Sequence, residues 1–168
     1  MGVSGSGKTT VGAALAAVLR AEFIEGDAHH PAANVEKMAA GIPLTDADRE
    51  PWLATLAELL ADRHARSSST VLACSALRRD CRDRLRGAVP SGESFVLHLA
   101  ADADVLRPRL ATRRGHYMPA SLLESQLATL EPLEPDEPGA TIDATGLEDA
   151  TPPRRGSPRT CSRKRDRG

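Results

Sequence analysis

Aromatic residues, cysteine and long apolar runs are all scarce in this sequence of 168 residues. The aromatic residues comprise two Phe, one Trp and one Tyr, so Ala and Leu must fill most of any core. The three cysteines stand at no spacing typical of metal ligands, which argues for reduced thiols rather than a zinc site or a disulfide framework. No apolar stretch approaches the ~20 residues that cross a membrane, and no secretory signal is recognisable. We therefore expect a cytoplasmic protein without a membrane partner.

The charge is nearly balanced overall but unevenly distributed. The formal net charge of −1 gives no reason to expect a nucleic-acid or membrane partner. Residues 151–168, however, carry seven Lys or Arg and one acid, so residues 1–150 hold a net charge of −7. This Pro- and Arg-rich tail lacks apolar periodicity, which is typical of disorder. We expect one folded domain over 1–150 and a disordered basic tail over 151–168.

Helical and strand patterns alternate along residues 1–150. Apolar residues recur at helical spacing in the longer segments, and short apolar runs stand between them. Thr45 followed three residues later by Asp48 resembles a capping box at the start of a long helix. Such alternation predicts an α/β fold, a parallel sheet with helices on both faces. The expected helices are 7–20, 31–41, 45–66, 77–86, 102–113 and 119–130, and the expected strands are 23–25, 70–74, 95–99 and 140–144.

The first nine residues carry the strongest chemical signal. They contain the pattern G-x-x-x-x-G-K-[ST], in which backbone N–H groups surround phosphate oxygens and glycines allow a close approach. Lys8 should reach the β- and γ-phosphates of ATP, and Thr9 should give its hydroxyl to Mg²⁺. The alternative is a chance match, which the α/β pattern of the chain disfavours. The predicted ATP-binding residues are Gly2, Val3, Ser4, Gly5, Ser6, Gly7, Lys8, Thr9 and Thr10.

The two ends of the expected domain do not fit a P-loop fold (an NTPase fold whose first loop binds phosphate). A strand normally delivers this loop to the carboxyl edge of the sheet, whereas only Met1 precedes Gly2. After Gly146 a helical pattern begins and then breaks into the Pro/Arg-rich tail. We expect that the first strand is truncated, that the true start lies upstream of Met1, and that a frameshift accounts for the tail.

Two carboxylates follow the predicted strand 23–25. Glu25 and Asp27 should lie beside the phosphate site, because strand ends of a parallel sheet meet at one edge. One could orient a water on Mg²⁺, and the other could accept the proton of an attacking hydroxyl. The next buried strand runs into Ser75 and supplies no acid. Ordinary loop acids remain the alternative interpretation.

Several basic residues could recognise an anionic acceptor. His30, Asn34 and Lys37 share one face of the helix that Pro31 opens, a combination that suits a polyhydroxy acid. A solvated helix face explains the same spacing equally well. Arg49 and Arg78 are further cations near the ends of expected elements.

A second pair of cations precedes Gly115. Arg109 and Arg113 stand one helical turn apart, as in a lid that closes over the phosphates of ATP. The lid is expected near 113–120. A surface salt-bridge pair is the alternative.

Together these blocks resemble the gluconokinases of the shikimate-kinase-like group, and the resemblance covers residues 1 to about 145. The residues that carry it are Gly2-Val3-Ser4-Gly5-Ser6-Gly7-Lys8-Thr9, Glu25-Gly26-Asp27, His30-Pro31, Asn34, Lys37-Met38, Gly41-Ile42-Pro43-Leu44, Asp46, Asp48-Arg49, Pro51-Trp52, Ala73-Cys74-Ser75-Ala76-Leu77-Arg78, Arg109-Leu110, Arg113, Gly115-His116-Tyr117-Met118, Gln126 and Leu130-Glu131-Pro132.

The resemblance implies a nucleoside-monophosphate-kinase-like α/β enzyme, usually dimeric, that converts D-gluconate to 6-phosphogluconate with MgATP. In this sequence Lys8, Asp27 and Arg113 would be catalytic, and Arg109 with Arg113 would contact phosphates. The candidate gluconate contacts would be Asp27, His30, Lys37, Arg49 and Arg78. Ala28-His29 departs from the acid-plus-apolar pair expected before His30.

Two other functions stay open on the sequence. A related small-molecule kinase such as shikimate kinase would share the phosphate loop, although the blocks 41–52 and 74–78 favour gluconokinase. An inactive nucleotide-binding fragment would explain the irregular ends.

Overall fold

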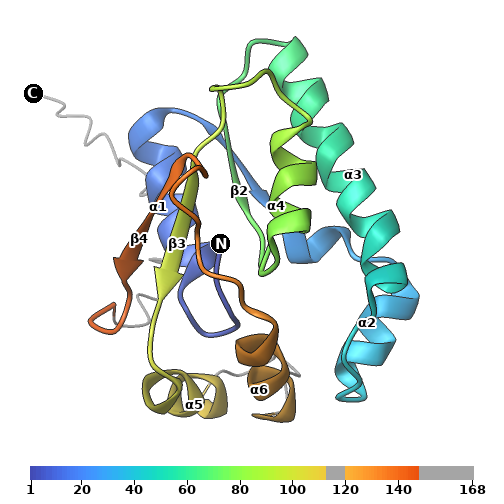
Figure 1. The fold of residues 1–168 in the computed structure, drawn as a ribbon, viewed down its shortest axis with the longest axis vertical. Helices are drawn as coiled ribbons and strands as arrows, with labels where there is room; N and C mark the ends of the chain where they lie inside the picture. The colour runs from blue at the N-terminus through green and yellow to red at the C-terminus, as the bar shows by residue number, and fades with distance from the viewer. Residues whose placement is uncertain (113–119, 148–168) are drawn as a thin grey trace, which may run out of the picture.

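The computed structural model describes residues 1–112 and 120–147, and Figure 1 shows their arrangement. The predicted lid around Arg113 and the basic tail 151–168 lie outside the described residues, apart from Ala120 at the end of the lid range. The helices are α1 (Lys8–Leu19), the 3₁₀-helix η1 (Gly26–His29), α2 (Ala32–Ala39), α3 (Asp46–Ala65), α4 (Arg79–Arg86), α5 (Ala103–Thr112) and α6 (Ala120–Thr129). The strands are β1 (Glu22–Glu25), β2 (Thr70–Ala73), β3 (Val96–Ala100) and β4 (Gly139–Asp143).

The strands form two parallel pairs rather than one continuous sheet. β1 pairs with β2, with Ile24 opposite Leu72, and β3 pairs with β4, with His98 opposite Thr141. The predicted parallel α/β architecture is therefore confirmed, but the expected single sheet is divided between β2 and β3. Met1 lies at that division, near the ends of both strands (Figure 1).

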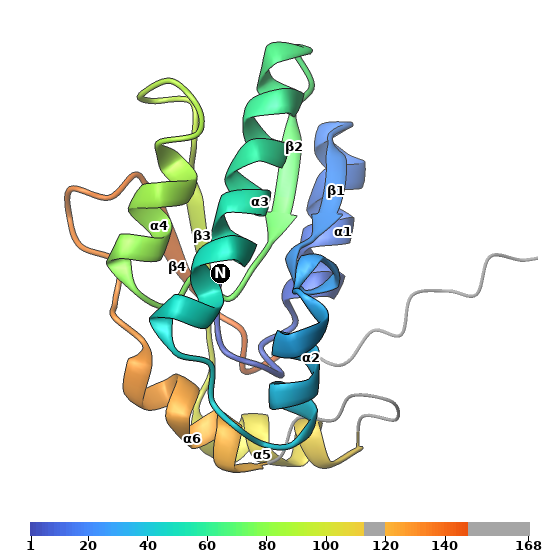
Figure 2. The same ribbon diagram turned by 90° about the vertical axis from the view of Figure 1, so that its right-hand side faces the viewer.

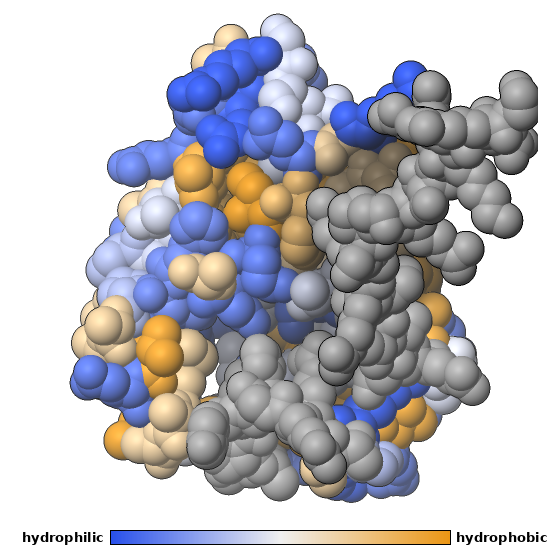
Figure 3. All heavy atoms as spheres, turned by 180° about the vertical axis from the view of Figure 1, so that it is seen from behind, coloured by the Kyte–Doolittle hydropathy of each residue, from blue (hydrophilic) through white to orange (hydrophobic). Residues whose placement is uncertain are grey.

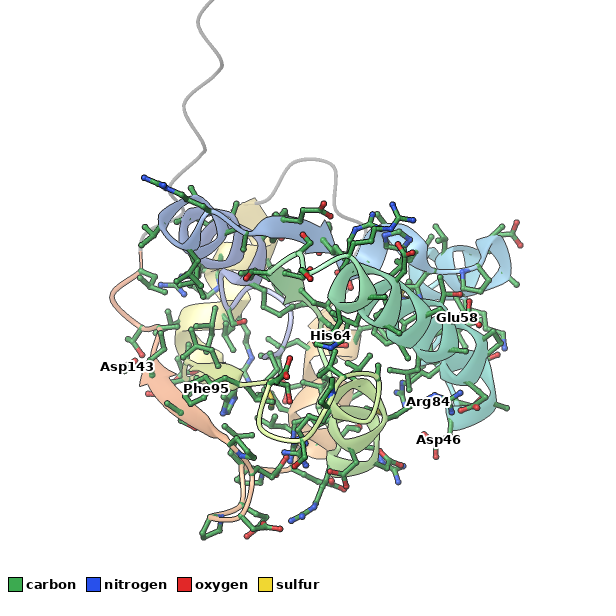
Figure 4. All side chains as sticks on the ribbon, turned by 90° about the horizontal axis from the view of Figure 1, so that it is seen from above. Asp46, Glu58, His64, Arg84, Phe95 and Asp143 are labelled. Carbon is green, nitrogen blue, oxygen red and sulfur yellow. The ribbon has the colours of Figure 1, made fainter. Side chains whose placement is uncertain are left out.

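Helices cover both faces of the strands, as the alternating pattern predicts. Viewed along the strands, α1 lies on one face while α3 and α4 lie on the other (Figure 4). Helices α5 and α6 lie together beyond the carboxyl end of β3, near the loop that precedes α1 (Figures 1 and 2). This end of the molecule gathers the segments from which the site is built. Two buried clusters hold the layers together, one formed by Trp52, Leu53, Leu56, Cys74, Ala76, Cys81 and Leu85, the other by Val3, Leu77, Leu106 and Leu123.

The predicted boundaries agree with the structure to within two residues. The capping box is present, because the Thr45 hydroxyl accepts the Asp48 N–H at 3.2 Å and the Asp48 carboxylate accepts the Thr45 N–H at 2.9 Å. The predicted helix 77–86 instead begins at Arg79. Ala76 has a positive φ of 41° and Arg78 is extended, so the chain cannot enter a helix earlier.

A buried ion pair holds the loop before α4. Arg82 and Glu137 have side chains that are 1% and 0% exposed, and two guanidinium N–H groups each meet a carboxylate oxygen at 2.7 Å. Arg82 also donates to the carbonyls of Leu77 and Glu131, each at 3.1 Å. The pair thereby fixes the loop after β2, which contributes to the site, against the segment after α6.

Candidate active site

The loop from Gly2 to Thr9, here called the phosphate loop, has the backbone of an anion cradle. Gly5 and Gly7 have φ values of 83° and 90°, a region in which residues with a Cβ are strained. A Cβ on Gly2 would lie 2.7 Å from the carbonyl oxygen of Leu99, so the loop passes too close to β3 for any side chain. Helix α1 then begins at Lys8, and its positive end faces the loop. The glycine pattern therefore produces the conformation for which the sequence predicts phosphate binding.

Three polar side chains of the phosphate loop define its chemistry. The Lys8 ammonium donates to the carbonyl of Val3 at 3.1 Å, which keeps the cation folded over the loop. The Ser6 hydroxyl is fully buried and has no hydrogen-bond partner in the described structure. Thr9, in the first turn of α1, is exposed. A buried hydroxyl without a partner among the described residues and a lysine in the same loop fit a loop shaped for an anion.

A cavity of about 320 Å³ opens next to this loop and is here called the arginine pocket. Its size is that of a small-molecule site. Its polar lining comes from five separate segments of the chain: the phosphate loop, the turn after β1, α3, the loop after β2, and α6. The polar and charged residues that line it are Ser4, Lys8, Asp27, His30, Arg49, Ser75, Arg78, Ser125, Gln126 and Thr129.

Trp52 forms one wall of the arginine pocket and orders its neighbours. Its indole N–H donates to the Gly26 carbonyl at 2.8 Å, in a buried bond that joins α3 to η1. Its ring stacks on His30 with a centroid distance of 4.1 Å and an interplanar angle of 15°. Burial lowers the pKa of His30, although Asp27 opposes the shift. His30 is thus held as a largely neutral ring beside Asp27.

Asp46 joins the two arginines that give the pocket its name. One of its carboxylate oxygens accepts from Arg49 at 3.0 Å and the other accepts from Arg78 at 3.0 Å. Arg78 also meets Asp80 at 3.0 Å, and the nearby Asp80 and Asp46 raise its pKa. The Nε atom of Arg78 is nevertheless buried without a hydrogen-bond partner among the described residues. This orphan donor indicates that the pocket is built for an acceptor group.

Two of the predicted basic site residues, Lys37 and Arg109, do not line the arginine pocket. Lys37 does not line the arginine pocket, because its ammonium pairs with Asp48 at 2.6 Å. Arg109 does not line it either, and its guanidinium donates to the carbonyls of Ala144 at 3.1 Å and Thr145 at 2.8 Å. Arg113 lies outside the described residues. Residue spacing placed Lys37 on the correct helix but could not reveal its partner on α3.

Two of the three residues on the predicted binding face of α2 therefore contact α3 instead of the pocket. Asn34 is 3% exposed and donates to the Asp48 carbonyl at 2.7 Å, so it fastens α2 to α3. Only His30 of the three reaches the pocket. The solvated-face alternative is wrong for Asn34, which is buried.

Gln126 lines the arginine pocket, although no sequence motif assigns it a role. Its side-chain carbonyl accepts the backbone N–H of Ser4 at 2.7 Å, so α6 holds the phosphate loop directly. The contact joins residues 122 positions apart, and no local pattern could reveal it. Its only sequence signal was its place in a block that resembles the gluconokinases.

Reactive thiols and protein-only metal sites play no part in the described site. Burial raises the pKa of the Cys74 thiol to about 12 and that of the Cys81 thiol to about 11. Across residues 1–112 and 120–147 no three His, Cys, Asp or Glu side chains gather to hold a metal ion. Within the same residues no helix combines the length and apolar character needed to cross a membrane.

Known proteins share both the sequence and the fold. A family profile described as AAA domain matches residues 1–133. Gluconokinase of Gluconobacter oxydans is 55% identical over 82% of this chain and 76% of its own length. Thermosensitive gluconokinase of Escherichia coli is 44% identical over 82% of this chain and 72% of its own length.

Two solved structures superpose closely on this one. A sugar kinase from Janibacter sp., solved without ligand, matches with a TM-score of 0.81 and 53% identity over 86% of this chain and 82% of its own. A gluconokinase from Sinorhizobium meliloti matches with a TM-score of 0.76 and 48% identity over 86% of this chain and 79% of its own. The chain belongs to the gluconokinase family of P-loop kinases.

Proposed function

We propose that this chain is a gluconokinase, which transfers the γ-phosphoryl group of ATP to the 6-hydroxyl of D-gluconate. One observation carries the proposal. The arginine pocket is lined at one side by Ser4 and Lys8 of the phosphate loop, and at the other by Arg49 and Arg78. Residues predicted to bind phosphate and residues predicted to bind the acceptor thus line one cavity, together with Asp27, which supports the proposal.

The phosphate loop would bind ATP through its backbone N–H groups. Lys8 would leave the Val3 carbonyl for the β- and γ-phosphate oxygens, where a full negative charge is the stronger acceptor. Thr9 would give its hydroxyl to Mg²⁺, whose other ligands would be phosphate oxygens and waters, since no three His, Cys, Asp or Glu side chains gather to hold a metal ion among the described residues. When bound, Mg²⁺ would neutralise charge on the β- and γ-phosphates.

The arginine pocket would bind the sugar acid. Arg78, with its unpartnered buried Nε, and Arg49 would face the carboxylate and the hydroxyls of gluconate. Asp46 holds both guanidinium groups in place before the ligand arrives, so less side-chain freedom is lost on binding.

Transfer then needs alignment and one proton acceptor. The 6-hydroxyl oxygen of gluconate attacks the γ-phosphorus, the bond from that phosphorus to the β–γ bridging oxygen breaks, and ADP departs. Asp27 accepts the hydroxyl proton, and the stacked His30 beside it restricts the position of the acceptor. Lys8 stabilises the charge that develops on the phosphoryl oxygens.

An acceptor panel tests the proposal. ADP release is measured with D-gluconate, other aldonic acids and shikimate, and the product is identified by ³¹P NMR. Phosphorylation of gluconate at C6, at a kcat/KM at least about tenfold above that for shikimate, is expected. Preference for shikimate would assign the related kinase activity, and ATP binding without turnover of any acceptor would favour the inactive nucleotide-binding alternative.

A further inference from the structure

The loop that carries Arg78 is bonded to a buried ion pair. Among the described residues, every ion pair without Glu137 has at least one side chain that is 40% exposed or more. Figure 3 shows such hydrophilic side chains on one face of the surface. Arg82 and Glu137 are instead 1% and 0% exposed. A buried pair contributes little net stability compared with apolar side chains of the same volume, because both charges lose their hydration. The segments that the pair holds in place therefore explain it better.

The Arg82 guanidinium binds two segments of backbone in addition to its partner. Its Nε and Nη2 atoms each donate to the Glu137 carboxylate at 2.7 Å. Its Nη1 atom donates to the carbonyls of Leu77 and Glu131, each at 3.1 Å, and Nη2 donates to that of Pro132 at 3.2 Å. Arginine is suited to this task, because it offers five N–H donors in one rigid plane. One buried side chain thus joins the loop after β2 to the segment after α6.

Glu131 bonds to the same loop on both sides of Arg78. Its N–H donates to the Leu77 carbonyl at 2.9 Å, and its carboxylate accepts the N–H of Arg79 at 2.6 Å. The residue before Arg78 and the residue after it are therefore both tied to the segment after α6. The three residues Arg82, Glu131 and Glu137 are here called the clasp. The backbone of Arg78 cannot shift without breaking bonds to the clasp.

The clasp does not itself reach the arginine pocket. Leu77 and Arg78 are among the described residues that line the pocket, whereas none of the three clasp residues is. The buried Nε atom of Arg78 has no hydrogen-bond partner among the described residues. The clasp can therefore influence a ligand in the pocket only through the position of the Arg78 loop. Displacement of a binding group by about 1 Å can cost up to a hundredfold in rate.

We propose that the clasp positions Arg78 for the sugar acid. By holding the backbone on both sides of Arg78, it sets where the Nε donor of that residue meets the acceptor. Arg82 and Glu137 are then positioning residues for acceptor recognition, although neither touches a substrate. ATP binding depends on the phosphate loop and does not require the clasp. This inference rests on the proposed function, because it concerns the acceptor of that reaction.

Replacement of the buried pair by apolar side chains tests the proposal. Arg82→Met together with Glu137→Leu keeps the buried volume similar and leaves neither charge of the pair behind. The KM for gluconate should rise at least about tenfold, while the KM for ATP stays within about threefold of the parent. Arg84→Met together with Glu50→Leu is the matched control, since it removes an exposed ion pair from the same helix. Both KM values of this control should stay within about threefold of the parent.

A further substitution at Arg78 shows whether the clasp acts through this residue. Adding Arg78→Met to the doubly substituted clasp should raise the KM for gluconate by less than about threefold over Arg78→Met alone, because both changes remove the same contact. Effects on the KM that multiply would overturn the proposal, since the clasp would then act elsewhere. Equal rises in the KM for gluconate and the KM for ATP would also overturn it.

Arg82→Lys supplies a variant that keeps a cation beside Glu137. Lysine has three donors on one atom, so it cannot bond both segments as the planar guanidinium does. The KM for gluconate should rise at least about threefold without a rise for ATP, even if the doubly substituted clasp does not fold. An unchanged KM for gluconate in Arg82→Lys would overturn the proposal.

Amide exchange measures the clasp without any substrate. The Glu131 N–H, which donates to Leu77, should exchange at least about tenfold faster in Arg82→Lys than in the parent and in the surface control. Unchanged exchange would overturn the proposal, because the loop would then be held by other contacts. A parent chain that does not phosphorylate gluconate would refute the proposed function instead, and the exchange result would still show whether Arg82 holds the loop.

Discussion

The arginine pocket and the central groove are neighbouring cavities with opposite chemistry. The pocket is lined by fixed charges, with Arg49 and Arg78 held by Asp46. The central groove is a second cavity of about 880 Å³ that is bordered by residues of β2 and β3, and apolar side chains make up most of its lining. Lys8 lines both.

The difference teaches what each cavity can accept. In the arginine pocket, two guanidinium groups are already held in position and the Nε atom of Arg78 has no partner among the described residues. Such a pocket favours a small polar ligand that supplies hydrogen-bond acceptors. The central groove is bordered mostly by apolar side chains, so it offers few partners to a small charged ligand. The arginine pocket therefore suits a charged ligand, and the central groove suits apolar packing.

Removal of the Lys8 side chain, which lines both cavities, should give the largest effect of all. Lys8→Ala should lower kcat at least about a hundredfold, because a donor to the developing phosphoryl charge is lost. The melting temperature should change much less than the activity does, since the bond from Lys8 to the Val3 carbonyl joins two residues of the same loop. Turnover within threefold of the parent would contradict the assigned role.

Loss of Arg78 should act on the acceptor alone and sharpen the contrast between the cavities. Arg78→Met should raise the KM for gluconate roughly tenfold or more, with little change in the KM for ATP, because a charge-assisted contact is removed. Arg84→Met is the matched control, since Arg84 lies on α4, pairs with Glu50 and does not line the pocket. Equal effects on both substrates would make Arg78 a structural residue.

The Met1 amine should make the groove sensitive to pH. Its pKa falls from 8.0 to about 6 in the folded chain, so the unfolded chain binds more protons between these values. The free energy of unfolding should therefore rise by about 2 kcal/mol from pH 6 to pH 8 and then level off. Urea titrations should show this rise in material whose mass confirms Met1, and should lose it after N-terminal acetylation. A rise that survives acetylation must come from other groups.

A smaller change is expected when the Trp52 hydrogen bond is removed. Trp52→Phe keeps an aromatic ring against His30 but leaves the buried Gly26 carbonyl without its donor, at a cost of about 1–2 kcal/mol. Thermal unfolding measures the loss, and Phe95→Leu, at an exposed residue of the groove, provides a control. An unchanged melting temperature would show that water replaces the indole.

Substitution of Lys37 should give the smallest effect, because the structure and the sequence-based prediction assign this residue different partners. The sequence analysis places Lys37 among the gluconate contacts, whereas its ammonium pairs with Asp48, whose pKa falls to about 2 mainly through that bond. Lys37→Met should leave the KM for gluconate within about threefold of the parent. A rise in the KM for gluconate as large as that expected for Arg78→Met would support the predicted contact between Lys37 and gluconate.

Much of the site could be predicted because its signals are local in sequence. The phosphate loop, the Thr45–Asp48 capping box and the turn carrying Asp27 depend on spacing over a few residues. The bond from Gln126 to Ser4 and the stacking of Trp52 on His30 join distant segments, so no local pattern contains them. The start of α4 was also misplaced, because the positive φ of Ala76 reflects the packing of its loop.

By itself the sequence determined the α/β class, the phosphate loop and the set of cations available for an acidic acceptor. Glycine conformations, helical periodicity and capping are decided within a few residues, so they can be recognised without a fold. Only the tertiary structure decided which cations face the pocket and which are neutralised, and that the sheet divides between β2 and β3. Ion pairing and strand order depend on segments that are distant in the chain and become neighbours only in the folded molecule.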